Sequence, residues 1–123
     1  MPVRMRRAAP EDVASALAAE PRTDAERRLL TKHFLAVLTE RAPGNSVEVR
    51  VPPYAAAQVV PGVRHTRGTP PAVVETDADT WIAVATGELA WGDALASGRV
   101  VASGERTDLS PFMPLSEGGR AEG

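Results

Sequence analysis

The chain has 123 residues, contains no cysteine and carries a formal net charge of -2, with 14 lysine and arginine residues against 16 aspartate and glutamate residues. This length suits one domain with one hydrophobic core. The absence of cysteine excludes disulfides, thiolate catalysis and iron–sulfur clusters, and the slightly acidic balance argues against a nucleic-acid partner. No apolar run approaches the ~18 residues of a transmembrane segment, and no signal-peptide region follows the basic N-terminus, so we expect a cytoplasmic protein.

Two helices are predicted in the first third of the chain. Residues 1–9 are expected to be disordered, and a short helix opens at Pro10, where proline and the acids after it suit a first helical turn. Thr23 and Glu26 then form a capping box, the S/T-x-x-E pattern that starts a helix. Apolar residues follow at helical spacing until Pro43, which predicts a second, longer helix with one buried face.

A sheet is predicted to follow. Residues 46–51 (SVEVRV) alternate valines with polar or charged residues, which is typical of an antiparallel strand with one face in water. Further strands are predicted over 54–60, 72–76 and 99–103, and the segment 61–71 is predicted to be an extended turn.

The second half of the chain also contains two short helices. The first is predicted over 77–86, with an aspartate at its N-cap, and the second over 91–97. A last helical turn begins at Ser110, and the small, polar residues 116–123 are expected to be disordered. The predicted fold is therefore mixed α/β, of the α+β type, in one domain over residues 10–115.

Two short motifs stand next to these predicted helices: TGEL at 86–89 and GRVVASG at 98–104. Their order resembles the C-terminal half of the sterol carrier protein superfamily, which reads helix, T-G-x-L, helix, G-[RK]-[LIV]-x-[LIV]-x-G and a closing apolar segment. Here alanine stands at 102, where that pattern has a larger aliphatic residue. Three stretches look similar to a smaller bacterial branch of the superfamily: 46–56, 65–71, and 74–77 followed by Trp81.

The resemblance implies a five-stranded antiparallel sheet with helices packed on one face and an apolar tunnel between the two layers. Members of the superfamily carry sterols, fatty acyl chains and other lipids, and some are domains appended to enzymes. On this layout, eight residues would line the tunnel: Val49, Tyr54, Trp81, Trp91, Leu95, Leu109, Phe112 and Met113. The alternative is that these side chains fill an ordinary core, because a domain so poor in aromatic residues needs both tryptophans to build one.

The one concentration of polar side chains is a short loop with Arg64, His65 and Arg67. Two guanidinium groups and an imidazole could hold the carboxylate or phosphate head group of an amphipathic ligand. The competing interpretation is an exposed turn whose arginines pair with Glu75 or Asp77.

No catalytic constellation and no metal-ligand spacing is recognisable. The two histidines, His33 and His65, do not form an H-x-x-x-H pair, and neither a G-x-S-x-G elbow nor a glycine-rich phosphate loop occurs. Asp77 and Asp79 fall in the first turn of a predicted helix, so we interpret them as capping residues. His65 is the only candidate for proton transfer, and it has no partner evident in the sequence. We therefore expect no metal, no cofactor and no catalysis.

The leading hypothesis is non-catalytic binding of an apolar or amphipathic small molecule, of lipid or fatty-acyl type. The apolar face of the sheet and the closing segment 109–115 would enclose this ligand. The alternative is a ligand-free interaction module, acting as a homodimer or as an accessory to a separately encoded enzyme. The first hypothesis requires a pocket of several hundred Å³, and an exposed apolar patch without an internal cavity favours the second.

Overall fold

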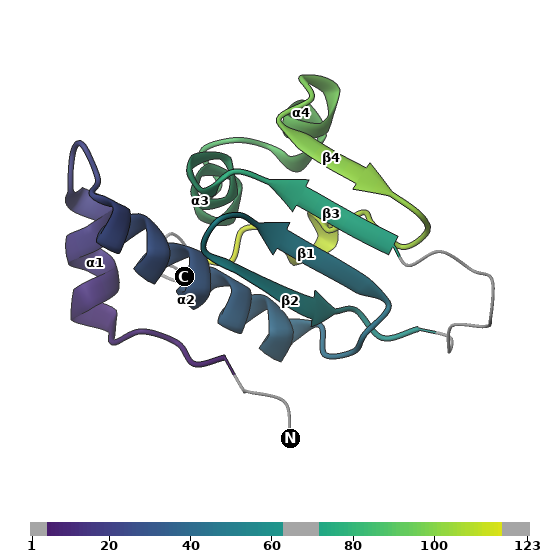
Figure 1. Ribbon diagram of the computed structural model, residues 1–123, viewed down its shortest axis with the longest axis horizontal. Helices are drawn as coiled ribbons and strands as arrows, with labels where there is room; N and C mark the ends of the chain where they lie inside the picture. The colour runs from purple at the N-terminus through teal and green to yellow at the C-terminus, as the bar shows by residue number, and fades with distance from the viewer. Residues whose placement is uncertain (1–4, 63–71, 117–123) are drawn as a thin grey trace.

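The computed structural model describes residues 5–62 and 72–116, which form one sheet with helices on one of its faces (Figure 1). Every helix and strand predicted from the sequence is present, whereas most of the predicted turn over 61–71 lies outside the described residues. In chain order the elements are α1 (Pro10–Ala18), α2 (Asp24–Arg41), β1 (Val47–Val51), β2 (Ala55–Val59), β3 (Ala72–Thr76), α3 (Ala78–Thr86), α4 (Trp91–Ala96), β4 (Val100–Ser103) and the 3-10 turn η1 (Ser110–Phe112).

The described residues form a four-stranded sheet in the order β2-β1-β3-β4. β1 pairs antiparallel with β2, and β3 pairs antiparallel with β4, but the two central strands β1 and β3 run parallel. The expected five-stranded, all-antiparallel sheet is therefore wrong on both points within the described residues. The physical reason is that alternation reports one wet face, which is the same for both strand directions. β3 runs in the same direction as β1 and opposite to β2. It therefore forms a parallel pair because it joins β1, and it would have formed an antiparallel pair at the free edge of β2.

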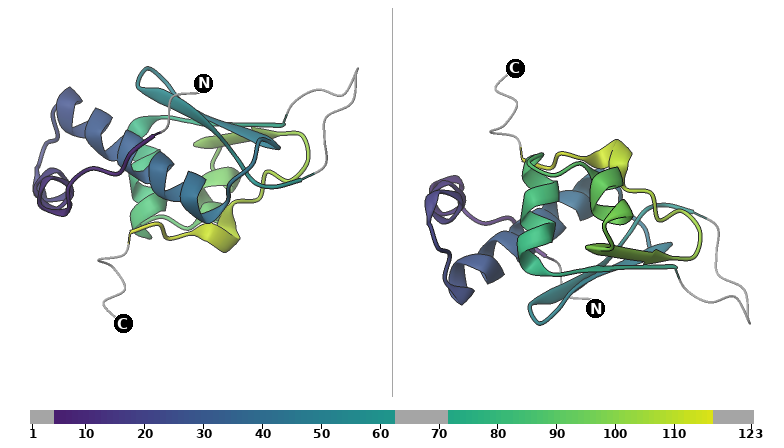
Figure 2. Two further views of the ribbon diagram at one scale, coloured as in Figure 1. Left: turned by 90° about the horizontal axis from the view of Figure 1, so that it is seen from below. Right: turned by 90° about the horizontal axis from the view of Figure 1, so that it is seen from above.

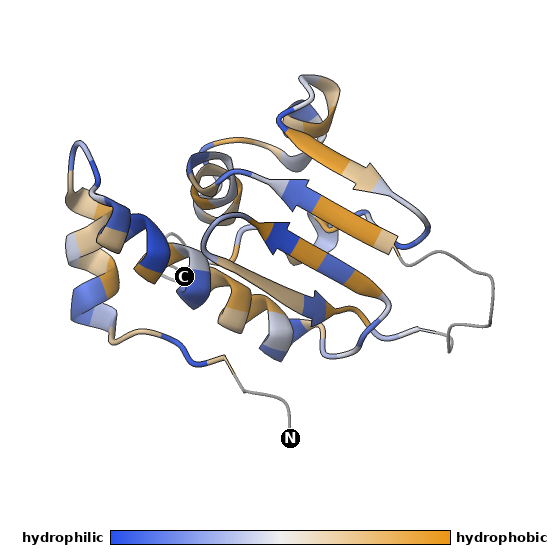
Figure 3. Cartoon of the chain, viewed as in Figure 1, coloured by the Kyte–Doolittle hydropathy of each residue, from blue (hydrophilic) through white to orange (hydrophobic). Residues whose placement is uncertain are grey.

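Alternation along β1 separates the two faces of the sheet, as predicted. Val47, Val49 and Val51 are fully buried, whereas Glu48 and Arg50 point to the opposite face. The same alternation is visible as blue and orange bands along β1 in Figure 3. The two further views show that α2, α3 and α4 all lie on one side of the sheet, and that no helix of the described residues covers the other side (Figure 2). The buried valines of β1 belong to the core on the helix side.

The longest helix, α2, begins where the sequence predicts. The Thr23 amide donates to Glu26 Oε1 at 2.8 Å, and the Glu26 amide donates to Thr23 Oγ1 at 3.2 Å, which completes the capping box. The apolar side of α2 is buried among α1, α3 and β2, with Phe34 and Leu38 at its centre. The covering layer is therefore built on α2.

The ends of α3 also follow the sequence. The Thr80 amide donates to Asp77 Oδ1 at 2.7 Å, which confirms the predicted N-cap, and Gly87 at φ 89° ends the helix. Ahead of α1, the described residues 5–9 lie along α2, where the Ala8 amide donates to His33 Nδ1 at 3.0 Å.

The two faces of the sheet offer a matched test of this packing, because the same substitution can be made on each. We expect Val49→Ala to lower the free energy of unfolding by about 2 kcal/mol, since it deletes two buried carbons and leaves a cavity. Val101 is 62% exposed on the open face, so Val101→Ala should cost at most about 1 kcal/mol, the span of strand propensities. Urea denaturation at low protein concentration measures both, and equal losses would contradict the assignment of the faces.

Candidate functional site

Most of the apolar residues predicted to line a tunnel lie between the sheet and the helices. Val49, Trp81 and Leu109 are 0% exposed and Trp91 is 4% exposed, and all four belong to one core cluster. The other predicted residues divide into two groups. Tyr54, Phe112 and Met113 are partly buried and pack against that core, whereas Leu95 is 37% exposed on α4 and lies outside it.

The predicted head-group residues are Arg64, His65 and Arg67, and all three lie outside the described residues. The two carboxylates suggested as their partners are placed. Asp77 caps α3, and Glu75 is exposed on the open face of the sheet.

Residues 109–116, which we call the closing strap, cover the core beside the C-terminal ends of α2 and α3. Two leucines of the strap, Leu109 and Leu115, are fully buried. The amides of Leu115 and Ser116 both donate to the Ala85 carbonyl, at 2.7 and 3.0 Å. Ala85 lies in the last turn of α3, where carbonyls lack helical donors, so the strap caps that helix end.

A single arginine holds the outer side of the strap. Arg41, the last residue of α2, donates through its guanidinium group to the carbonyls of Phe112 at 3.1 Å and Pro114 at 2.8 Å, and at 3.5 Å to that of Leu115. The strap is mostly irregular chain, so these contacts and its two buried leucines keep it in place.

Three buried polar atoms have no hydrogen-bond partner among the described residues: Thr31 Oγ1, Ser46 Oγ and Trp91 Nε1. The other tryptophan differs, because its indole Nε1 donates to the Thr31 carbonyl at 3.3 Å. An unpaired buried donor costs about 1–3 kcal/mol. Trp91 Nε1 is therefore a buried N–H donor that is left unpaired among the described residues.

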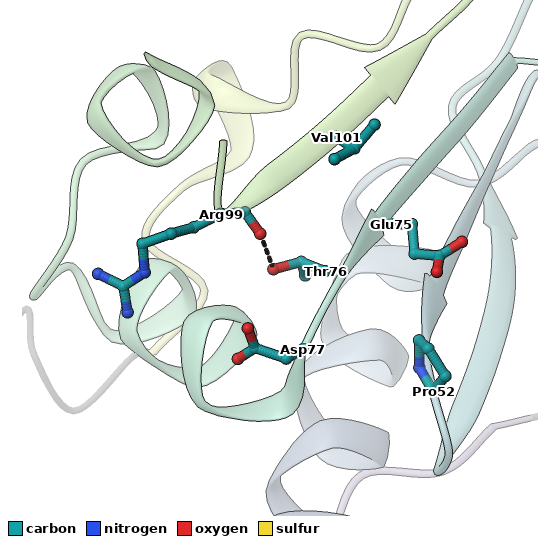
Figure 4. Close-up of a pocket in the computed structure, with 6 residues that line it drawn as sticks. All are labelled: Pro52, Glu75, Thr76, Asp77, Arg99 and Val101. Atoms are coloured by element: carbon teal, nitrogen blue, oxygen red, sulfur yellow. Dashed lines mark hydrogen bonds between the residues drawn. The ribbon is translucent and has the colours of Figure 1, made fainter. Parts of the chain in front are cut away.

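Two open pockets lie outside this layer, where the carboxyl ends of the parallel strands β1 and β3 meet. One, of about 440 Å³, is shown in Figure 4, and the other is about 410 Å³. Glu75 and Pro52 line both. In the first pocket, the Thr76 hydroxyl donates to the Arg99 carbonyl at 2.8 Å, while the Arg99 side chain points away from Glu75. Sequence reasoning missed these pockets because it did not predict the parallel pair.

A polar cluster ties the β1–β2 turn to the start of α2 and α3. The Tyr54 hydroxyl donates to Asp24 Oδ1 at 3.2 Å, and Arg27 bridges that carboxylate to Asp79, with contacts of 3.3 and 3.0 Å. Burial raises the pKa of the Tyr54 phenol above its ordinary value, and the hydrogen bond to Asp24 raises it further. The hydrogen bond to Asp79 raises the pKa of Arg27. These contacts give Tyr54 a structural role at the edge of the layer.

Within residues 5–62 and 72–116, no group of three or more histidine, cysteine, aspartate or glutamate side chains is placed to hold a metal ion. None of the helices in these ranges is long and apolar enough to cross a bilayer.

Comparison with protein families finds one described as a bacterial SCP ortholog, whose model matches residues 22–115. The matched region begins just before α2 and ends within the closing strap, so it includes the sheet, its covering helices and the apolar layer between them. A comparison with curated proteins gives no match.

Tyr54 is the only tyrosine of the chain, so the change in ultraviolet absorbance on phenol titration reports this residue alone. We expect a folded-state pKa above 10.0, and we expect Asp24→Asn to lower it, because this substitution removes the charged carboxylate that accepts a hydrogen bond from the phenol. The exposed Asp93 on α4 provides a matched control, since Asp93→Asn should leave the titration unchanged.

The same shift has a consequence for stability. The folded chain holds the phenol proton more tightly than the unfolded chain does. Its stabilising contribution is therefore complete below pH 10.0 and is lost as the pH rises through the folded-state pKa. A phenol that titrates at or below 10.0 would contradict the placement of Tyr54.

Proposed function

Because this chain belongs to the bacterial SCP ortholog family, a sterol carrier protein-like family, we propose that it binds an apolar or amphipathic small molecule without chemically transforming it. The proposed ligand is of lipid or fatty-acyl type and lies between the sheet and the helices. The observation that supports this place best is the layer itself, which combines a continuous apolar surface with the unpaired N–H of Trp91.

An amphipathic ligand matches the chemistry of this layer. Its hydrocarbon part would contact the valine face of β1 and the apolar sides of α2 and α3, and would be removed from water at about 25 cal/mol per Å². A carbonyl or carboxylate oxygen on the ligand would accept a hydrogen bond from Trp91 Nε1 and so remove the cost of the unpaired donor.

Binding in this layer requires the chain to open. In the described structure, the side chains of the layer contact one another, with Val49, Trp81 and Leu109 all at 0% exposure. We propose that the closing strap moves away to admit the ligand. This movement breaks the contacts of the strap with Arg41 and with the Ala85 carbonyl, and it uncovers the two buried leucines. In this proposal, the strap controls the rate of exchange and the layer determines the affinity.

The first experiment is native mass spectrometry of the protein purified from its own host, followed by extraction of bound lipid. We expect a species heavier than the 13.0 kDa chain by one hydrophobic molecule, which the extract identifies. Titration of the protein with a fluorescent fatty acid then measures affinity. An unmodified mass together with no saturable binding of the fatty acid would refute the proposed function.

The two tryptophans provide a matched test of the polar anchor. Trp91→Phe removes an unpaired N–H, so we expect affinity for the fatty acid to fall roughly 3- to 10-fold, the worth of one hydrogen bond. Trp81→Phe loses the internal hydrogen bond to Thr31 instead, so it should lower stability more than Trp91→Phe does. Equal affinity of the wild-type and Trp91→Phe proteins would show that Trp91 does not donate a hydrogen bond to the ligand.

The strap is tested separately through Arg41. We expect Arg41→Gln to speed hydrogen exchange at the Leu115 and Ser116 amides and to speed release of the bound fatty acid, each about 5- to 10-fold, because it breaks the contacts of the guanidinium group. Arg99→Gln is the control, at an exposed arginine whose side chain has no hydrogen bond to the strap among the described residues. Faster amide exchange with an unchanged release rate would show that the ligand takes another route.

A further inference from the structure

On the face of the sheet that the helices leave open, one row of side chains is complementary to itself. Strand register sets this pattern, because residues paired across neighbouring strands stand side by side on the same face. Two rows cross the open face from β2 to β4: Ala56, Arg50, Glu75 and Val101 in one, and Gln58, Glu48, Val73 and Ser103 in the other.

The first row has its opposite charges at the centre and its apolar residues at the ends. Arg50 stands beside Glu75 in the parallel register, but it forms its ion pair with Glu48 of its own strand, at 3.0 Å. Glu75 is exposed, and no ion pair to its carboxylate occurs among the described residues. Val101, at the β4 end, is 62% exposed, and Ala56 at the β2 end leaves room for a larger side chain. A partner for this row must therefore present the same pattern in reverse order.

We propose that a second copy of this chain packs on the open face, about a two-fold axis that runs parallel to the strands and midway between β1 and β3. This axis exchanges β1 with β3 and β2 with β4, because the strand order β2-β1-β3-β4 is centred between β1 and β3. Rotation about this axis leaves every residue at the same position along the strand direction. Each row of one copy therefore lies opposite the same row of the other copy. Arg50 of one copy then faces Glu75 of the other, and Ala56 faces Val101, twice each.

The second copy is favoured over an unrelated partner by this reverse order. Closed two-fold contacts use one surface patch twice, so the patch must match itself. The first row does so in both charge and size, with each central charge meeting its opposite and each valine meeting an alanine. Aligned sheets pack about 10 Å apart with an angle of about 30° between them. This angle displaces facing residues more with greater distance from the axis, so the central Arg50–Glu75 pairs remain most directly opposite one another.

The size of the face determines how strong such a dimer is. Four strands of five residues or fewer cover roughly 300 Å² at usual strand spacing, against about 800 Å² per partner in a stable interface. The dimer is therefore weak and reversible, and it forms at high protein concentration. Its central pairs are charged and close to water, so added salt weakens it.

The experiment is sedimentation equilibrium of the full chain over a range of protein concentrations at low salt. We expect the apparent mass to rise from 13.0 kDa toward twice that value. Arg50→Glu and Glu75→Arg should each weaken association at least tenfold, because each places like charges opposite one another. The double variant Arg50→Glu/Glu75→Arg should restore it. Glu88→Arg, at an exposed glutamate after α3, is the matched control for charge and should have no effect.

Thermal unfolding followed by circular dichroism shows whether each variant remains folded. Val101→Arg provides a second test at an exposed position, because it puts a long cation against Ala56 of the other copy without changing the core. It too should weaken association. A chain that stays monomeric at the highest concentration overturns the proposal. A dimer that tolerates all three single substitutions also overturns it, since such a dimer must use another surface, such as the free edge of β4.

Discussion

The three valines of β1 must be removed from water, and most of the chain forms the layers that bury them. β1 pairs with strands on both sides, and its three valines are at 0–1% exposure beneath the helix layer. α2 supplies the largest part of that layer, with its capping box defining where it starts and its apolar side defining how it lies. α3 follows β3 directly, so it packs beside α2 on the same side of the sheet (Figure 2). Removing apolar area from one face of the sheet organises both layers.

The closing strap completes this cover in a different way from the helices. Two leucines give it apolar contact with the core, while its backbone is held by one arginine and one helix-end carbonyl. In the proposed function, this irregular part opens while the sheet and α2 stay folded. The proposed binding of an apolar molecule requires this division of roles between the sheet with its helices and the strap.

The open face and the strap lie on opposite sides of the sheet, so the two proposals make separate demands on the molecule (Figure 2). A ligand between sheet and helices uses the valine face, whereas a second copy uses the face that presents Arg50 and Glu75. A dimer formed on the open face leaves Arg41 and the strap in water. Ligand exchange and self-association can therefore occur in the same molecule without competing for a surface.

The sequence by itself determined the position of every helix and strand among the described residues, because these depend on local chemistry. The capping box at Thr23, the aspartate cap of α3, the alternation along β1 and the glycine after Thr86 each act within a few residues. Periodicity also indicated part of the buried core, such as Val49 on β1, whereas Leu95 is exposed on α4. Membership of the sterol carrier protein-like family was also readable, from the order of short motifs.

Only the tertiary structure decided how these elements meet. The parallel pairing of β1 with β3 depends on which edge β3 joins, and no local pattern encodes that choice. The same pairing places Arg50 beside Glu75, 25 positions apart, and brings two strand ends together around the outer pockets. The contact of Arg41 with the strap spans more than 70 residues, and the difference between the two tryptophans depends on whether a carbonyl of α2 lies within reach. Each of these features joins residues far apart in the chain, so it exists only once the hydrophobic layers have assembled.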